Sequence, residues 1–199
     1  MSENSTLIGR VEKLMINCPP DDKVAADRVQ IYCSLHGIEG DKHATPVRDT
    51  SGVREREMFN RPKTERRGTV VNWRQWSGVS EEEMMLLAEK YGLPVTKEVA
   101  RRLGELVGAN LLVSGIPDFT RLPGTSLLAF PSCSWLVISE NLPCKGAGDQ
   151  IEIEFPQAKA TDFPKLAMGI RGLVGMVFEA GAINVGEPIE VRRRGIELR

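Results

Sequence analysis

The sequence has few histidines and cysteines, and it lacks close pairs of cysteines. Its 199 residues include only two histidines and four cysteines, and these cysteines form no CxxC pair. Structural zinc sites normally use such close ligand pairs, so a zinc knuckle is not indicated. A chain of this length buries about 70% of the surface exposed in its unfolded form, so it needs no disulfide. The cysteines are therefore expected to be free thiols in a reducing compartment.

The chain also lacks the features of secreted, membrane and nucleic-acid-binding proteins. Residues 1–6 hold no basic region, no apolar leader follows them, and no run approaches the ~20 apolar residues that span a membrane. The formal net charge is -1, so there is no general surplus of cations for nucleic acid. We expect a cytoplasmic protein without a nucleic-acid or membrane partner.

Glycine and proline are plentiful, and helical periodicity is confined to a few stretches. The 19 glycines and 12 prolines favour a turn-rich β fold. Apolar or alternating runs predict strands at 7–16, 29–33, 68–73, within 108–116, and at 125–130, 135–139, 151–155, 172–178, 183–185 and 189–191. The succession of strands and glycine turns predicts a mainly β, α+β fold in which the sheet closes on itself, as one domain over residues 1–199.

Two helices have clear signals. Ser80 and Glu83 form a capping box, and an apolar stripe beginning at Met84 recurs at helical spacing up to Tyr91. A second helix is predicted over 97–106, and a shorter helical piece over 163–169. The methionine in the first stripe is interpreted as core.

One cysteine stands in an unusual loop. Cys144 follows Pro143 and precedes Lys145, Gly146 and Gly148. Proline restricts the backbone before the thiol, and bare glycine backbone lets a ligand approach closely. A thiolate is both a nucleophile and a soft metal ligand, and the neighbouring lysine favours it. The alternative is an idle thiol in a hairpin loop. Cys133, eleven residues earlier, is either a resolving thiol for Cys144 or an ordinary turn residue.

Both histidines lie within one short segment. His36 and His43 flank a tight turn in which Gly37 and Gly40 precede Asp41. A metal pair is conceivable, but the spacing is not that of one helix face and no third ligand is evident. A capped surface turn is the alternative interpretation.

Residues 44–67 carry many charges and show no periodicity. From Arg48 to Arg67 there are seven lysines and arginines against four acids. A loop of this length is either a solvated lid or a functional element. In the second case it is a cationic flap over an anionic ligand, because the guanidinium fork matches phosphate geometry.

In their order and spacing, four pieces resemble the MOSC domain, the module named for the C-terminal part of molybdenum cofactor sulfurase. The pieces are the 37–43 turn, the Gly108–Leu111 junction with Gly115, the Leu142–Cys144 loop and the closing 172–187 hairpin. They span nearly the whole chain. Two features depart from the family pattern: Ala109 replaces a common glutamate, and the 44–67 insertion is longer than usual.

The resemblance implies a MOSC-type β-barrel with a few short peripheral helices and a site for the molybdenum cofactor, molybdopterin. The family cysteine corresponds to Cys144, which either carries sulfur as a persulfide or binds molybdenum. The implied cofactor-binding residues are Gly40, Asp41, His43 and Asn110, supplemented by the cations Arg67, Lys145 and Arg171, which are suited to a pterin phosphate.

The family offers more than one function. The chain is a candidate sulfur transferase for the cofactor, a cofactor-dependent reductase of N-hydroxylated substrates, or a non-catalytic cofactor carrier. The pyridoxal-phosphate desulfurase half of the sulfurase has no room in 199 residues. A separate cysteine desulfurase or a molybdoenzyme is therefore the expected protein partner.

Overall fold

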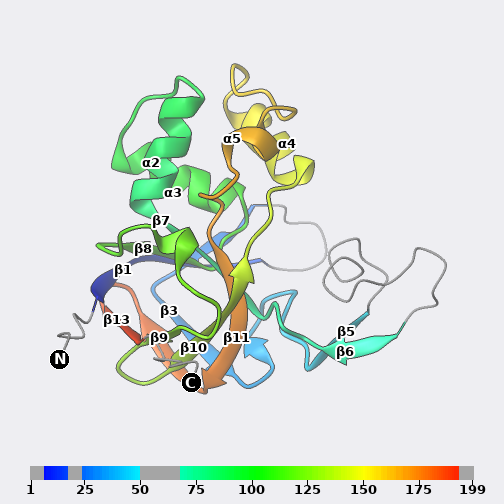
Figure 1. Cartoon of the computed structure of the whole chain (residues 1–199), viewed down its shortest axis with the longest axis vertical. Helices are drawn as coiled ribbons and strands as arrows, with labels where there is room; N and C mark the ends of the chain where they lie inside the picture. The colour runs from blue at the N-terminus through cyan, green and yellow to red at the C-terminus, as the bar shows by residue number, and fades with distance from the viewer. Residues whose placement is uncertain (1–6, 18–23, 50–67, 193–199) are drawn as a thin grey trace, which may run out of the picture.

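A closed seven-stranded β-barrel forms the centre of the protein (Figure 1). The computed structural model describes residues 7–17, 24–49 and 68–192. The barrel strands follow the order β13, β9, β10, β11, β7, β8 and β1, and a further pairing of β13 with β1 closes the ring. The pairing of β7 with β8 is parallel and the others are antiparallel. The prediction of a mainly β fold with a closed sheet is confirmed.

The barrel strands have the following bounds: β1 Leu7–Ile16, β7 Trp76–Ser80, β8 Leu111–Ser114, β9 Leu127–Ala129, β10 Ser134–Glu140, β11 Leu173–Glu179 and β13 Pro188–Arg192. Strand β2 (Ala26–Arg28) pairs with the end of β1. A small sheet joins β12 (Gly181–Asn184), β3 (Gln30–Ser34) and β4 (Gly37–Ile38). Strands β5 (Val47–Asp49) and β6 (Thr69–Val71) form a hairpin that extends away from the barrel (Figure 1).

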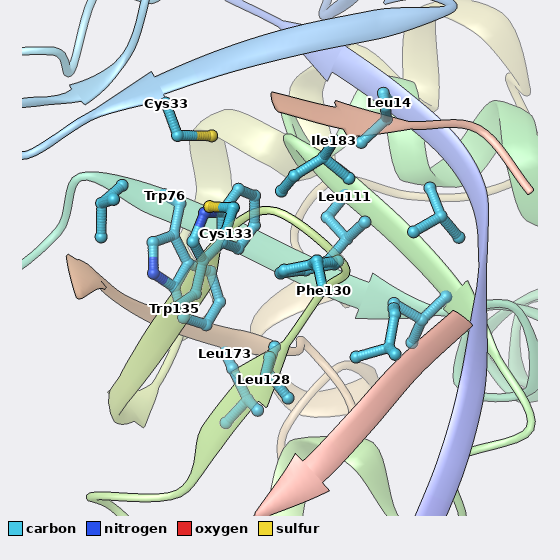
Figure 2. Packing of buried hydrophobic residues seen from close by; sticks show 14 of the residues in the cluster. Leu14, Cys33, Trp76, Leu111, Leu128, Phe130, Cys133, Trp135, Leu173 and Ile183 are labelled. Carbon is cyan, nitrogen blue, oxygen red and sulfur yellow. The ribbon is translucent and has the colours of Figure 1, made fainter. Parts of the chain in front are cut away.

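Aromatic rings fill the barrel. Trp76 of β7 stacks on Trp135 of β10 with ring centroids 4.9 Å apart, and Phe130 meets the same ring edge-on at 5.3 Å. Gly175 makes this packing possible, because a Cβ there would lie 1.9 Å from the Leu136 carbonyl oxygen. Figure 2 shows that Cys33 and Cys133 lie in this core beside the tryptophans, and both are buried.

Four helices, α2 (Glu81–Lys90), α3 (Lys97–Leu106), α4 (Lys145–Glu154) and α5 (Phe163–Leu166), gather on one side of the barrel among the described residues (Figure 1). A single turn of 3-10 helix, η1, covers Phe119–Arg121. The predicted helices at 81–91 and 97–106 are confirmed, and the Ser80 hydroxyl accepts a hydrogen bond from the Glu83 N–H at 3.1 Å. Met84 is fully buried in the core between the helices and the barrel, as expected.

The predicted strand at 151–155 is wrong, because this segment belongs to α4. The alternation of Ile151 and Ile153 suggested a strand, but Ile151 is fully buried while Ile153 is 74% exposed. Ala147 and Ile151 pack on the same core, and their separation of four residues is the spacing of one helix face. Gly148 lets the helix approach closely, since a Cβ there would lie 2.6 Å from the Ala160 carbonyl oxygen.

The segment 44–67 is not wholly irregular, because its beginning forms β5. The remainder of this segment, residues 50–67, lies outside the described residues and includes the predicted cofactor ligand Arg67. No helix in the described parts of the chain has the length and apolar character needed to cross a membrane.

Candidate functional site

A buried carboxylate organises the turn that the sequence singled out. Gly40, with φ +81°, turns the chain directly before Asp41, whose side chain is fully buried. The carboxylate accepts hydrogen bonds from the backbone N–H groups of Asn17 at 2.7 Å and His43 at 2.8 Å. It also accepts from Asn110 Nδ2 at 2.7 Å and from His43 Nδ1 at 2.9 Å. Gly40 thus allows the turn, and the Asp41 carboxylate holds it in place through hydrogen bonds.

These donors hold the Asp41 carboxylate in its charged form. Burial alone would raise the pKa of Asp41, but hydrogen bonds from the His43 ring and from the backbone of Asn17 and His43 outweigh it and lower the pKa to about 2. Because an ionised carboxylate only accepts hydrogen bonds, His43 must carry a proton on Nδ1. The ring is therefore fixed with its Nε2 edge turned away from Asp41.

Asn110 ties the same carboxylate to the end of the parallel strand pair. Its backbone N–H donates to the Ser77 carbonyl oxygen at 2.8 Å, and its Oδ1 accepts from the Ser77 N–H at 3.0 Å. Neighbouring Ala109, the departure from the family pattern, is fully buried in the core beneath the helices. In this chain the residue at position 109 therefore packs in the core.

Cys144 lies at the amino end of α4 and is exposed, whereas Cys33 and Cys133 are buried. The segment that leads to it is anchored by the Asn141 N–H, which donates to the Gly172 carbonyl oxygen at 2.8 Å. Cys133 makes a hydrogen bond with Cys33, which together with burial raises its pKa. Cys133 thus belongs to the barrel core and not to the site, so the structure does not support it as a resolving thiol.

The Asp41 turn and the Cys144 segment border one open cavity of about 370 Å³. Its walls bring together His43, Asn110 and Cys144, three of the residues predicted from the sequence. Lys145 is not part of this lining; its side chain is 67% exposed and pairs with Asp149 at 3.3 Å. His36 is exposed and does not line the cavity. Within the described ranges, no three His, Cys, Asp or Glu side chains are placed to hold a metal ion.

Three cationic side chains line the same cavity: Lys42, Arg74 and Arg171. Arg171 is buried, and its Nη2 donates to the Val107 carbonyl oxygen at 2.5 Å. Arg74 donates from Nη2 to Asn141 Oδ1 at 3.2 Å, which links the cavity wall to the Cys144 segment. Its guanidinium also lies 5.7 Å from the centre of the Trp73 ring, and Arg48 lies 5.8 Å from the same ring.

Sequence reasoning missed three residues that line the cavity, Arg74, Asn141 and Trp76. Arg74 follows the strand predicted at 68–73 and carried no motif of its own. Asn141 stands three residues before Cys144, and its polar side chain at a strand end was the one available signal. Trp76 begins β7, a strand that the sequence analysis did not predict.

The comparisons with known proteins agree with this architecture. The MOSC domain family pattern matches residues 65–190. A curated relative, YuaD from Bacillus subtilis (strain 168), is 42% identical over 159 residues, which cover 78% of this chain and 76% of YuaD. The name of that protein carries a provisional assignment to metal–sulfur cluster biosynthesis.

Solved structures show the same fold. The crystal structure of the YuaD protein from B. subtilis has a TM-score of 0.81 and 34% identity, covering 94% of this chain and 97% of YuaD. YiiM from Geobacillus stearothermophilus has a TM-score of 0.63 at 12% identity, with 95% of this chain and 77% of that chain covered. YiiM from Escherichia coli has a TM-score of 0.57 at 15% identity, with coverages of 93% and 70%. The match over 65–190 and the extended identity to YuaD establish that the chain belongs to the MOSC domain family.

Proposed function

We propose that the 370 Å³ cavity binds the molybdenum cofactor and that Cys144 carries sulfane sulfur at its edge. One observation carries the proposal: an exposed thiol and three cationic side chains border the same open cavity. The name of the relative YuaD, which refers to metal–sulfur cluster biosynthesis, also supports a role in sulfur handling.

The residues present fit a pterin that carries a phosphate. The volume lies within the range of about 300–1,000 Å³ that is typical of small-molecule sites. Lys42, Arg74 and Arg171 supply positive charge for the phosphate, and Asn141 supplies an amide for a polar heterocycle. In this proposal the metal arrives bound to the pterin, and the described residues offer no group of three His, Cys, Asp or Glu side chains placed to hold it directly.

Each part of the site has a defined task. When bound, the cofactor supplies a molybdenum centre able to accept sulfur. The cations hold the phosphate. The hydrogen bonds of the Asp41 carboxylate fix His43 and Asn110 in the cavity wall. Cys144 receives sulfur from a persulfide donor: its thiolate attacks the outer sulfur, the S–S bond of the donor breaks, and the donor leaves as a thiolate. The reaction needs no external oxidant, and a cysteine desulfurase is the proposed class of donor.

Binding of molybdopterin to the purified chain tests the cavity. Replacing a cation that lines it should weaken binding about 10- to 100-fold, because a charge-assisted hydrogen bond contributes about 1.5–3 kcal/mol. Lys42→Met and Arg74→Met are the test variants. Lys90→Met is the matched control, since Lys90 donates to the Leu166 carbonyl oxygen and does not line the cavity. Equal affinity for all four proteins would reject the cavity as the cofactor site.

Cys144→Ser separates sulfur carriage from simple carriage of the cofactor. If Cys144 carries sulfur, this variant takes up none from a persulfide donor. If the chain only carries the cofactor, the variant binds it normally and the wild-type thiol stays unmodified. A reductase of N-hydroxylated substrates is recognised by turnover of such a substrate by the cofactor-loaded protein.

A further inference from the structure

The His43–Asp41 pair is arranged like a proton-transfer group. The His43 side chain is 41% exposed and lines the cavity, whereas the Asp41 side chain is fully buried behind it. The Nδ1–H donates to Asp41 Oδ1 at 2.9 Å, and the His43 backbone N–H donates to the same oxygen at 2.8 Å. Two bonds to one carboxylate oxygen fix both the ring orientation and the tautomer.

The position of the ring is also held from the other side of the turn. Asn72 Nδ2 donates to the His43 carbonyl oxygen at 2.7 Å, and the same amide donates to the Thr45 carbonyl oxygen at 3.0 Å. Asn110 and Asn17 complete the shell of donors around the carboxylate. A catalytic group needs this kind of support, because small errors in position weaken proton transfer.

We infer that His43 donates a proton to the sulfur that leaves when Cys144 takes sulfur from a donor, and that Asp41 is its positioning residue. The inference rests on the proposed sulfur-carrying function. His43 and Cys144 both line the cavity, and a persulfide donor must reach this cavity edge to meet Cys144. In this step His43 acts through an N–H at Nε2, while its Nδ1–H stays bonded to Asp41.

The step is balanced in atoms and electrons. The anionic sulfur of Cys144 attacks the outer sulfur of R–S–SH, and the new S–S bond forms as the old one breaks. The electron pair of the broken bond stays on the inner donor sulfur, which takes the proton from His43 Nε2. The products are the Cys144 persulfide, the thiol R–SH and a neutral imidazole. The donor's inner sulfur is reduced, and the Cys144 sulfur is oxidised by the same amount.

Other charged groups around the cavity act on the donor and on His43. Lys42, Arg74 and Arg171 attract an anionic donor but oppose a positive charge on His43. Asp149 lies on the α4 side of the cavity, near Cys144. Asp41 is the acid in direct contact with the His43 ring. Its negative charge is therefore the one in contact with the ring that donates the proton.

Leaving-group dependence tests the inference. A proton donor matters for an alkyl thiolate, which leaves poorly, and is dispensable for an aryl thiolate, which is stable as an anion. The probes are glutathione persulfide and 5,5′-dithiobis(2-nitrobenzoate), with the rate at Cys144 followed by peptide mass spectrometry. His43→Asn preserves an N–H donor towards Asp41 but has no acid.

His43→Asn should slow the reaction with glutathione persulfide about 100-fold and change the reaction with the aryl disulfide less than threefold. Asp41→Asn, which removes the carboxylate that holds the ring, should slow the glutathione persulfide reaction and leave the aryl reaction within threefold, and Asp41→Glu should restore part of the lost rate. Equal slowing with both probes, or no slowing with either, overturns the inference while the sulfur-carrying function stands. Failure of the wild-type protein to take up any sulfur at Cys144 rejects both.

Discussion

Cysteine has opposite environments in the barrel core and at the edge of the cavity. Cys33 and Cys133 are sealed between the small sheet and the barrel, hydrogen-bonded to each other and packed beside Trp76 and Trp135. Cys144 stands exposed at the start of α4, next to a cavity lined by cations. The buried thiols of Cys33 and Cys133 act as small apolar side chains in the core, whereas the exposed Cys144 thiol is accessible to reactants.

The two regions also differ in the polar side chains that they bury. The barrel is filled with apolar and aromatic side chains, whereas the wall of the cavity is built on the Asp41 carboxylate with its Asn17, His43 and Asn110 donors. A buried charge is costly unless every partner is in place. We infer that apolar packing stabilises the barrel, whereas the hydrogen-bonded carboxylate stabilises the cavity wall and keeps it rigid.

The largest expected contrast is in thiol reactivity. Iodoacetamide should modify Cys144 at least ~1,000 times faster than Cys33 or Cys133 in the native protein, because the buried thiols react only after the core opens. The hydrogen bond with Cys33 and the burial that raise the pKa of Cys133 slow it further. Peptide mapping by mass spectrometry reads each cysteine separately. Comparable rates at Cys133 and Cys144 would remove the contrast between the two regions.

The barrel should not tolerate one added methyl group at its closest contact. Gly175→Ala places a Cβ 1.9 Å from the Leu136 carbonyl oxygen and 2.6 Å from the Trp76 ring. We expect a loss of about 3 kcal/mol in the free energy of unfolding, measured by urea denaturation. A variant as stable as the wild type would mean that the barrel packing is looser than described.

Acid should weaken the cavity wall through Asp41. Because the pKa of this carboxylate is lowered to about 2, its ionised form adds stability that is complete above about pH 4. That contribution, about 2 kcal/mol, should be lost as the pH falls from 4 to 2. Asp41→Asn should be less stable at neutral pH and should lack this part of the acid dependence.

Exposed Asp162 provides the control for this prediction. Asp162→Asn should keep the acid dependence of the wild-type protein in the same urea titrations. If Asp41→Asn also keeps it, the carboxylate does not have the hydrogen-bonded charge that we describe.

The smallest effect is expected at the start of α4. A Cβ at Gly146 would meet no atom within 4 Å, and the residue lies in the first turn of the helix. Gly146→Ala should therefore raise the free energy of unfolding by about 0.5–1 kcal/mol, through the lower entropy of the unfolded chain. A decrease in the urea midpoint would show that the helix start is more crowded than the structure indicates.

Much of the fold could be predicted because local signals agreed with the tertiary structure. The capping box at Ser80 and the apolar stripe from Met84 defined α2 without help from other parts of the chain. The prediction for 151–155 failed because two isoleucines at alternate positions fit a strand, whereas the segment is the end of α4, a helix that packs closely on Ala160 and Phe163 at Gly148. Such contacts are not visible in local sequence.

The site was predictable only in part for the same reason. Cys144 and the Asp41 turn carry distinctive neighbours, so their residues could be singled out. Arg74 gains its place through a long-range hydrogen bond to Asn141 and through its approach to the Trp73 ring. Residues so far apart in the sequence meet only because β7 and β10 both pair with β11.

Mass analysis of the Cys144 peptide after incubation with a persulfide donor tests the central claim most directly. The account predicts a gain of one sulfur atom on that peptide, removable by a thiol reductant and absent in Cys144→Ser, with the Cys33 and Cys133 peptides unchanged. An unmodified Cys144 peptide, or sulfur distributed equally over the buried cysteines, would contradict it.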